Sequence, residues 1–398
     1  MKLGLHYHIN YSGNGRTSIM VPGYFGLFID EVAKQSDHLY LFLHHKEDQD
    51  NENDYEIYLG DKITLVSLGE SATFYHRLLM PGRYIRIIKP YADKLDCLII
   101  RGPTPLLPHF SKYLSPHCKI AIMLVGDYVK SLPGLRQPLH RKIPIIILTY
   151  WYQWLQNREV KKHLILVNSG EIFEQYQAIT KKLHLIKTTT LQEGVIYEKA
   201  PELDSSKIKL LYTGRITPKK GLLEVIEALS ILEQNGVSNL EFNLVGWEDE
   251  NRISTIELMK QKSKVLNLKT PIIFHGRKAI DESYFSIYRN ADIYIMASHH
   301  EGFPRTIWEA MASSLPVIAT KVGSIPYYLE NNKNAILISP KSPEEIASSV
   351  LLLINDKILR NQIITNGLEL VREITLEKQT KIIINHIKNE YTGNQFWA

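Results

Sequence analysis

Short apolar runs alternate with amphipathic stretches along almost the whole chain, and this alternation limits the possible folds more than any other feature of the sequence. Runs such as "HLYLFLHH" and "DCLIIRG" have the length and residue types of buried strands. Between them lie stretches with helical spacing, in which Leu222, Ile226 and Leu229 recur before a stop at Gly236. Strands separated by helices pair in parallel and carry helices on both faces. The pattern predicts an α/β fold.

The length favours two domains. A chain of 398 residues with 44% hydrophobic residues exceeds the usual size of one domain and can bury a large core. The alternation pauses between Leu191 and Lys207, in a polar stretch that contains Pro201. We place the interdomain linker there, which predicts a first domain over residues 1–195 and a second over 207–375.

The sequence indicates a cytoplasmic protein. Its first residues, "MKLGLHYHIN", lack the apolar core and small-residue cleavage site of an export signal. The longest membrane-like run, Ile143 to Tyr152, is half of the roughly 20 residues that a spanning helix needs. Cys97 and Cys118 are too few for a disulfide framework and lie in apolar runs.

Charge is distributed unevenly over the first half of the chain. The stretch from Glu31 to Glu70 has 3 basic and 10 acidic residues, whereas Arg77 to Lys162 has 15 basic and 4 acidic residues. Near residues 136–163, Arg and Lys alternate with Trp, Tyr and Ile, a mixture that suits an anionic membrane surface. The alternative is a basic surface around a buried helix. We expect no nucleic acid as a partner, since no nucleic-acid module is visible.

Two strand-to-helix loops of the second half carry candidate chemistry, because ligands of open parallel sheets bind outside the carboxyl ends of the strands. The first is "YTGRITPKKG", in which Gly214 allows close backbone approach and Arg215, Lys219 and Lys220 precede a helix. Cations beside a helix N-terminus favour a diphosphate. A solvated basic turn is the alternative.

The second loop is "HHEGFPRTIWEAMASSLPVIATKVGS", His299 to Ser324. It should follow a strand, with Pro304 at the first helical position, Glu301 in the loop and Glu309 in the helix. Both carboxylates could then face one ligand and accept hydrogen bonds from sugar hydroxyls. A surface ion pair between Arg305 and Glu309 is the alternative. His275, His299 and His300 lack the spacing of a zinc site.

Residues of these loops resemble the Glu-x7-Glu signature of the retaining nucleotide-sugar glycosyltransferases of family 4. The similarity continues through "LVGWE", "IIFHGR" and "SPEEIASSVLLLINDKILR" and covers most of the second half. The resemblance implies a GT-B fold, in which two Rossmann-like domains face each other across a cleft. It also implies transfer of a sugar from a nucleotide diphosphate sugar with retention of anomeric configuration, and no cofactor or metal.

The resemblance assigns roles to individual residues. Arg215 and Lys220 match the pair that neutralises the donor diphosphate, beside Gly214. Glu309 matches the carboxylate that binds the ribose, and Glu301 the one that contacts the donor sugar. The remaining donor-side matches are Gly302, Phe303 and Pro304, which cradle the sugar, and Thr306, which lies where the diphosphate meets the helix.

The first half resembles the family more loosely. Gly13 and Gly15, in "YSGNGRTS", look like the Gly-rich loop that closes over the donor. "GDY" stands where many relatives have a histidine near the acceptor, so Asp127 is a candidate catalytic contact on the acceptor side. In relatives the last helix packs back on the first domain, which we expect of residues 376–398, with Phe396 and Trp397 sealing the contact.

We therefore expect a hexosyltransferase that acts on a saccharide or lipid-linked saccharide, at the inner face of the plasma membrane, in cell-surface polysaccharide or lipopolysaccharide synthesis. Two alternatives stay open. One is a sugar-nucleotide epimerase or phosphorylase on the same fold. The other is a non-catalytic module that binds a nucleotide sugar or a glycan.

Overall fold

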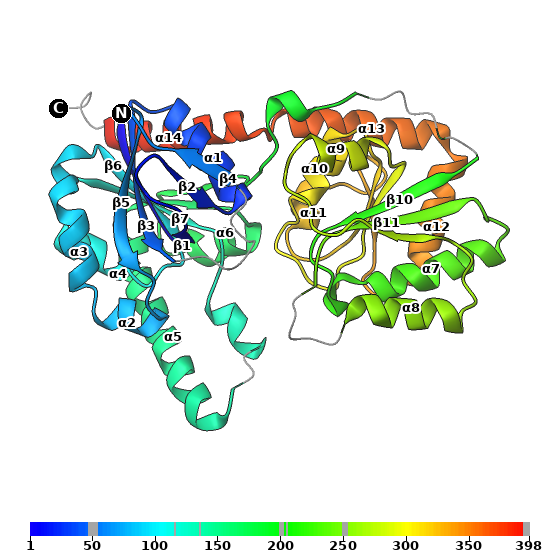
Figure 1. Ribbon diagram of the computed structural model, residues 1–398, viewed down its shortest axis with the longest axis horizontal. Coiled ribbons are helices and arrows are strands. Elements are labelled where there is room, and N and C mark those ends of the chain that lie inside the picture. The colour runs from blue at the N-terminus through cyan, green and yellow to red at the C-terminus, as the bar shows by residue number, and fades with distance from the viewer. Residues whose placement is uncertain are drawn as a thin grey trace. The chain divides into compact units, whose positions relative to one another are not determined.

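The structure, a computed structural model, describes residues 1–46, 55–114, 117–134, 137–198, 203, 206–248 and 254–392. The chain divides into two compact units, Met1–Thr188 with Glu377–Ala398, and Thr189–Leu376, each built on its own parallel sheet (Figure 1). The boundary precedes the expected linker because Leu191 is buried in the core of the second unit. Its carbonyl also accepts a hydrogen bond of 2.6 Å from the N–H of Leu376.

Unit 1 contains a seven-stranded parallel sheet. Its strands are β1 (Lys2–Tyr11), β3 (His38–His45), β5 (Ile63–Glu70), β6 (Cys97–Gly102), β7 (Lys119–Leu124), β8 (Leu164–Val167) and β9 (Leu183–Leu185). They lie in the order β5-β3-β1-β6-β7-β8-β9, so the sheet grows outward in both directions from β1, as in Rossmann-type folds. A separate antiparallel pair joins β2 (Ser18–Val21) to β4 (Tyr55–Tyr58).

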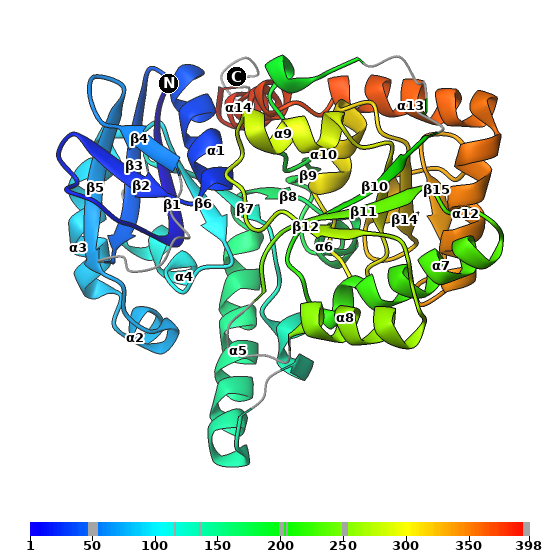
Figure 2. The ribbon, with the colours of Figure 1, turned by 45° about the vertical axis from the view of Figure 1, so that its right-hand side comes forward.

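Helices pack against this sheet. They are α1 (Gly23–Lys34), α2 (Phe74–Leu79), α3 (Gly82–Ile88), α4 (Leu107–Tyr113), α5 (Leu139–Val160) and α6 (Gly170–Gln177), with 3₁₀ turns η1 (Lys89–Lys94) and η2 (Val129–Gly134). The central strands β6, β7 and β8 are buried on both faces, as continuous apolar runs predict. Helix α5 projects from unit 1 in Figures 1 and 2. No helix among the described residues is long and apolar enough to cross a bilayer.

The last helix, α14 (Leu376–Thr392), packs on unit 1. The Nε2 of Gln35 donates to the carbonyl of Glu377 at 3.0 Å, and the hydroxyl of Tyr391 donates to the carbonyl of Ile120 on β7. The rings of His184 and His386 stack with centroids 3.9 Å apart. Phe396 and Trp397 lie outside the described residues.

Unit 2 repeats the same topology with six parallel strands. They are β10 (Ile208–Thr213), β11 (Leu240–Val245), β12 (Ile272–Phe274), β13 (Ile293–Met296), β14 (Val317–Thr320) and β15 (Ile336–Ile338), in the order β12-β11-β10-β13-β14-β15. Its helices are α7 (Leu222–Gln234), α8 (Thr255–Val265), α9 (Glu282–Arg289), α10 (Thr306–Ala312), α11 (Ile325–Tyr328), α12 (Pro343–Asn355) and α13 (Lys357–Arg372), with 3₁₀ turns η3 (Glu193–Val195) and η4 (Pro218–Lys220).

The order of strands in unit 2 brings the two candidate loops together. Strand β10 pairs with β13 in the middle of the sheet, so the loop after β10 and the loop after β13 leave the same edge side by side. This is the point where the strand order reverses, and open α/β sheets bind ligands at such a crevice.

Candidate functional site

The loop after β10 is held against the end of β11. Gly214 has φ 138°, and a Cβ on Gly246 would lie 1.9 Å from the carbonyl oxygen of Gly214. The hydroxyl of Tyr212 donates to the carbonyl of Arg215 at 2.8 Å, which fixes the backbone that carries this exposed guanidinium. Only glycine allows the two loop backbones to approach so closely.

The next residues of this loop lie against the end of β13. Gly221 has φ 68°, and a Cβ there would be 1.9 Å from the carbonyl oxygen of Ala297. The N–H of His299 donates to the carbonyl of Lys219 at 2.8 Å. Turn η4 therefore places Lys220 beside the loop that carries Glu301.

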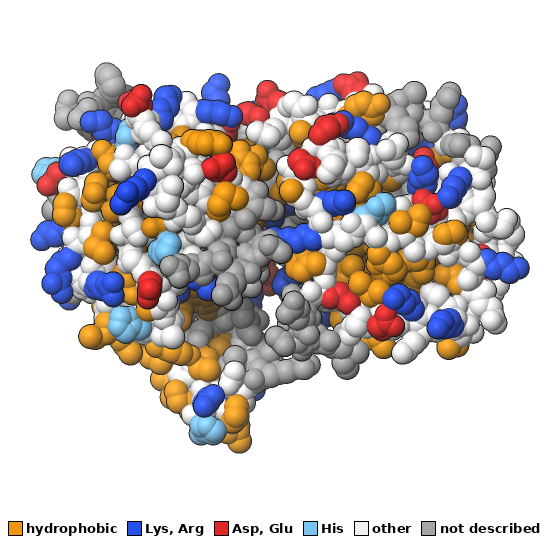
Figure 3. All heavy atoms as spheres, in the orientation of Figure 1, with side chains coloured by type: hydrophobic (Ala, Val, Ile, Leu, Met, Phe, Trp, Pro, Cys, Tyr) orange, Lys and Arg blue, Asp and Glu red, His pale blue; other side chains and the backbone are white. Residues whose placement is uncertain are grey.

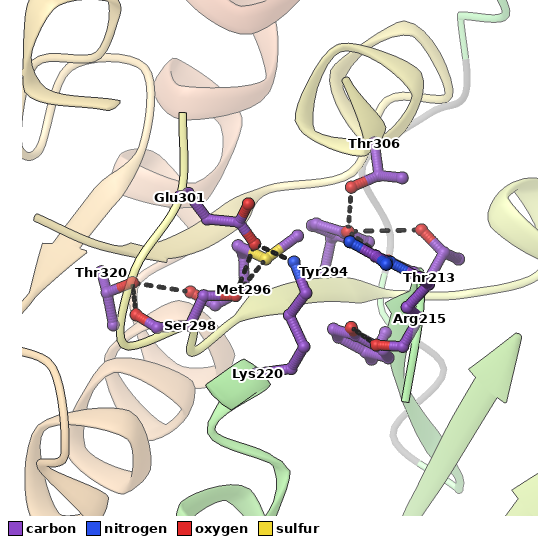
Figure 4. A network of polar contacts seen from close by, with 10 residues as sticks. Thr213, Arg215, Lys220, Tyr294, Met296, Ser298, Glu301, Thr306 and Thr320 are labelled. Carbon is purple, nitrogen blue, oxygen red and sulfur yellow. Dashed lines mark hydrogen bonds and ion pairs between the residues drawn. The ribbon is translucent and has the colours of Figure 1, made fainter. Parts of the chain in front are cut away.

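Lys220 and Glu301 form an ion pair between the two loops (Figure 4). The same carboxylate oxygen, Oε1 of Glu301, accepts a hydrogen bond of 2.8 Å from the hydroxyl of Ser298. Thr320, at the end of β14, donates to the carbonyl of Ser298 at 2.7 Å and so connects the pair to the sheet. The two charged side chains are 19% and 13% exposed, so a ligand can reach them.

Gly323 packs against the backbone of the Glu301 loop. The sequence analysis did not predict this contact. It has φ 54°, and a Cβ there would lie 1.8 Å from the carbonyl oxygen of Glu301 and 2.7 Å from that of Gly302. The N–H of Ser324 donates to the carbonyl of Gly302 at 2.8 Å. The glycine directly after a buried strand, in "IATKVGS", was the signal in the sequence.

Helix α10 begins at Thr306, two residues after the predicted start at Pro304. The carbonyl of Pro304 accepts a hydrogen bond of 3.2 Å from the N–H of Ile307, which closes the turn before the helix. Phe303 stacks on Trp308 with centroids 4.2 Å apart, so its ring anchors the loop to the core. The hydroxyl of Tyr294 donates to that of Thr306 at 2.7 Å (Figure 4).

Glu309 differs from the expectation that both carboxylates face one ligand, since it is buried and only 3% exposed. Its Oε1 accepts a hydrogen bond of 3.0 Å from Thr190, and its Oε2 accepts bonds from the hydroxyls of Tyr284 at 2.7 Å and Tyr288 at 2.9 Å. The surface ion pair with Arg305 is also not formed, because the carboxylate points into this cage of hydroxyls. Its role toward a ribose stays a prediction.

The cage continues toward the site as a network of hydroxyls. The hydroxyls of Tyr288 and Thr213 lie 2.5 Å apart, and those of Thr213 and Tyr294 lie 3.3 Å apart. Burial raises the pKa of Tyr284 well above its usual value, and the charge of Glu309 raises it further. The network connects Glu309 to Thr306 through neutral hydroxyls. In the sequence, the only sign of this network is that Tyr284 and Tyr288 are four residues apart, which places them on one face of a helix.

Three predicted residues, Gly13, Gly15 and Asp127, belong to unit 1. Both glycines have positive φ, 99° and 63°, and their loop is ordered by Asn14, whose Oδ1 accepts from the N–H of Arg16 at 2.8 Å. Asp127 uses its Oδ1 to accept from the N–H of Val129 at 2.7 Å, which starts the 3₁₀ turn η2. All three residues thus help to fix the local backbone of their loops, and their roles toward donor and acceptor stay predictions.

The histidines near the site have protein partners. His299 pairs with Glu224 at 2.8 Å, and His275 lies 2.8 Å from the Oδ1 of Asn243. Among the residues that the structure describes, no group of three or more His, Cys, Asp or Glu side chains is placed to hold a metal ion.

Comparisons with known proteins bear on unit 2 and on the fold. The family model described as Glycosyl transferases group 1 matches residues 195–370. The chain is 30% identical over 172 residues to the uncharacterized glycosyltransferase MJ1178 of Methanocaldococcus jannaschii, covering 42% of this chain and 44% of that protein. It is 28% identical over 203 residues to the capsular polysaccharide biosynthesis glycosyltransferase CapM of Staphylococcus aureus, covering 50% and 47%. The chain therefore matches less than half the length of these relatives.

A solved structure extends the likeness to both units. The crystal structure of Anabaena Alr3699/HepE in complex with UDP superposes with a TM-score of 0.69 over 98% of this chain and 99% of that chain, at 16% identity. At this identity the likeness shows the fold alone. The chain has a GT-B fold of two Rossmann-like units, and its residues 195–370 match the family model described as Glycosyl transferases group 1.

Proposed function

We propose that the protein is a retaining glycosyltransferase that moves a hexose from a nucleotide diphosphate sugar to a saccharide or lipid-linked saccharide acceptor. The observation that carries the proposal is the pair of Lys220 and Glu301 at the carboxyl edge of the unit 2 sheet, with Arg215 exposed on the same loop as Lys220. The relatives' names support this reaction class, and CapM supports a role in polysaccharide synthesis.

The chemistry follows from the charges at this edge. A departing nucleoside diphosphate gains negative charge as the glycosidic bond to the donor breaks, and fixed cations stabilise that charge. Lys220 and Arg215 would supply the cations, and Thr306 a hydroxyl at the start of α10. Glu301 would accept hydrogen bonds from the hydroxyls of the sugar and hold its ring in place. Because these two cations would stabilise the diphosphate, we propose a reaction that needs no metal.

The donor site is tested by a thermal-shift screen of UDP, GDP, ADP and their common sugars. A ligand at 100 times its dissociation constant stabilises by about 2.7 kcal/mol, which raises the unfolding midpoint by several degrees. We expect a shift with one base that is lost in Lys220→Ala and kept in Lys219→Ala, whose exposed side chain lies next along the same turn. A shift that survives in Lys220→Ala would refute the diphosphate assignment.

The anomeric configuration of the product tests the retaining mechanism. Proton NMR of the product should show the same anomeric configuration as the donor. An inverted product would overturn this part of the proposal. A product that forms equally well with and without acceptor would instead favour an epimerase, and phosphate-dependent cleavage of a glycoside would favour a phosphorylase.

We further propose that α5 contacts an anionic membrane. Large apolar side chains lie on its exposed face. They are Leu139 (74% exposed), Ile143 (54%), Ile147 (62%) and Trp154 (55%). Figure 3 shows hydrophobic side chains over this projecting part of unit 1. Large apolar side chains are rarely exposed together without a partner.

The charges of α5 favour lipid over protein as that partner. Arg158 is exposed beside the apolar face, and its guanidinium lies 5.1 Å from the ring centroid of Trp154. The helix has one acidic residue, Glu159, which is buried and paired with Lys162 at 2.9 Å. Basic and aromatic side chains on one helix face suit phosphate headgroups and the apolar layer beneath them.

Flotation with vesicles tests this surface. The protein should float with vesicles that contain phosphatidylglycerol and less with pure phosphatidylcholine. The double variant Ile147→Ser/Trp154→Ser should lose flotation. The control Val265→Ser/Ile358→Ser, which changes side chains of unit 2 that are 80% and 82% exposed, should keep it. Equal flotation of the two variants would show that the apolar face of α5 does not bind the vesicles.

A further inference from the structure

Unit 1 holds a cluster of basic side chains at the carboxyl edge of its sheet, formed by His8, His44 and Arg77. His8 lies on β1 and His44 on the adjacent strand β3, close to the point where β3 ends at His45. Arg77 lies on α2, which follows the carboxyl end of β5, the next strand of the sheet. The three side chains thus come from three neighbouring strand ends, where parallel sheets bind ligands.

The polar atoms of this cluster are buried without hydrogen-bond partners. They are Nε and Nη1 of Arg77, both ring nitrogens of His44, and Nδ1 of His8. The backbones of Gly69 and Pro103 lie near the imidazoles of His44 and His8 and offset part of the fall in their pKa. The side chain of His44 is fully buried. Buried polar atoms are paired in the great majority of cases, so a group of unpaired ones calls for an explanation, and a bound ion or ligand is one that fits a basic cluster.

Several other buried polar side chains of unit 1 have hydrogen-bond partners. The two ring nitrogens of His6, also on β1, lie 3.0 Å from the carbonyl of Phe42 and 3.2 Å from the hydroxyl of Thr104. The buried carboxylate of Glu159 is held by Ser111 and Lys162.

The charges of the cluster act on one another. Burial lowers the pKa of His8 and that of His44 to about 4, and the charge of Arg77 is the next cause in both cases. Burial also lowers the pKa of Arg77, whose polar neighbours include the hydroxyls of Tyr84 and Tyr128. Among the described residues no carboxylate pairs with Arg77. An anion placed among these groups would receive charge-assisted hydrogen bonds from the guanidinium.

An unpaired acceptor lies beside the cluster. Asn10 is the register partner of His44, and its Oδ1 is buried without a hydrogen-bond donor. An inorganic anion at the guanidinium would leave this acceptor unused, whereas a ligand that combines an anionic group with hydroxyls would satisfy both. A sugar phosphate has this combination.

We propose that Arg77, His44 and His8 bind the phosphate group of a phosphorylated saccharide acceptor, with a sugar hydroxyl donating to Asn10. The inference rests on the proposed function, because it takes unit 1 as the acceptor side of a glycosyltransferase. It narrows the acceptor from saccharides in general to those that carry a phosphate monoester or diester.

Calorimetric titration tests the site without a donor present. The probes are glucose 1-phosphate, its decyl phosphodiester, inorganic phosphate and glucose. Each is measured on the wild type, Arg77→Gln and the control Arg86→Gln, which changes an exposed arginine of α3. Lys220→Ala is included because phosphate can also occupy the cations of unit 2. We expect sugar phosphate binding that survives Lys220→Ala and Arg86→Gln and weakens about tenfold or more in Arg77→Gln, as loss of a charged hydrogen bond predicts.

The probes distinguish the sources of the phosphate. Tighter binding of glucose 1-phosphate indicates a soluble sugar phosphate, and tighter binding of the decyl diester indicates a lipid-linked acceptor. Equal binding of glucose and glucose 1-phosphate would overturn the proposal, as would binding that Arg77→Gln leaves unchanged.

Histidine NMR gives a measurement that needs no folded Arg77 variant. The imidazole resonances of His8 and His44, assigned with His8→Gln and His44→Gln, should titrate near pH 4 in the free protein. They should titrate closer to pH 6.5 with saturating glucose 1-phosphate. Unchanged titration would refute the site. If the histidine pKa values shift with glucose 1-phosphate but no nucleotide binds in the thermal-shift screen, the anion site of unit 1 is supported and the proposed nucleotide-sugar donor is refuted.

Discussion

At the scale of the residue, the ion pair of Lys220 and Glu301 makes a prediction that separates binding from turnover. In Glu301→Gln, Lys220 loses its partner and is free to meet a diphosphate, so a nucleoside diphosphate should bind as tightly or several-fold more tightly. Transfer should fall by about 10²-fold, the usual effect of removing one positioned group. The control Glu224→Gln, which loses only the contact with His299, should keep near-normal transfer. Loss of nucleotide binding in Glu301→Gln would contradict the assignment.

Glu309 makes a second prediction at this scale. Glu309→Gln leaves one of the hydroxyls of Thr190, Tyr284 and Tyr288 without its acceptor and should lower the free energy of unfolding by about 1–3 kcal/mol. The exposed Glu344 of α12 is the matched control, and Glu344→Gln should change stability little. Urea unfolding measures both. Nucleotide affinity in Glu309→Gln also tests the ribose role, since a purely structural carboxylate would leave affinity unchanged in the folded variant.

The sequence placed Lys220 and Glu301 on adjacent loops, but it did not show which residues surround the candidate site. Lys220 and Glu301 meet because both follow predicted strands that are neighbours in the sheet. The burial of Glu309 was missed, since it depends on Tyr284, Tyr288 and Thr190, which lie far from it in the sequence. The unpaired cluster around Arg77 was missed for the same reason, because three separate elements contribute to it.

At the scale of the element, most strands of the two parallel sheets match predicted apolar runs, whereas β2, β4, β5 and β9 were not predicted. Runs such as those of β6 and β10 are buried on both faces and stand out as continuous apolar segments. Strand β5 lies at the edge of its sheet and alternates buried with exposed residues, which gives a weaker signal. Strands β2 and β4 stabilise each other by pairing, and neither shows this in its own residues.

The turn after β14 makes the prediction at this scale. Gly323→Ala places a Cβ against the carbonyl of Glu301 in a backbone conformation that favours glycine, so the Glu301 loop must shift. We expect a loss of at least ~2 kcal/mol from overpacking and strain together. In Gly194→Ala no atom lies within 4 Å of the new Cβ, so thermal unfolding should be nearly unchanged. A stable Gly323→Ala with intact nucleotide binding would show that this support is dispensable.

At the scale of the whole molecule, acid should weaken unit 1 through its buried imidazoles. Burial lowers the pKa of His6 to about 3 and that of His8 and His44 to about 4, against 6.5 in the unfolded chain. Because the folded values are depressed, the unfolded state binds more protons below pH 6.5. The stability from neutral imidazoles is therefore complete above pH 6.5 and is lost as the pH falls toward 4.

For each of these imidazoles, the free energy of unfolding should fall by about 1 kcal/mol for each unit that the pH is lowered in this range. Urea unfolding between pH 7.5 and 5, followed by limited proteolysis to identify the unit that opens, measures the loss. The pH dependence of the free energy of unfolding should be weaker in His8→Gln. It should also be weaker in the wild type with glucose 1-phosphate, because a bound phosphate favours the protonated imidazoles. A stability that stays constant over this range would show that these histidines are not held neutral by the fold, and it would remove the electrostatic basis of the anion site in unit 1.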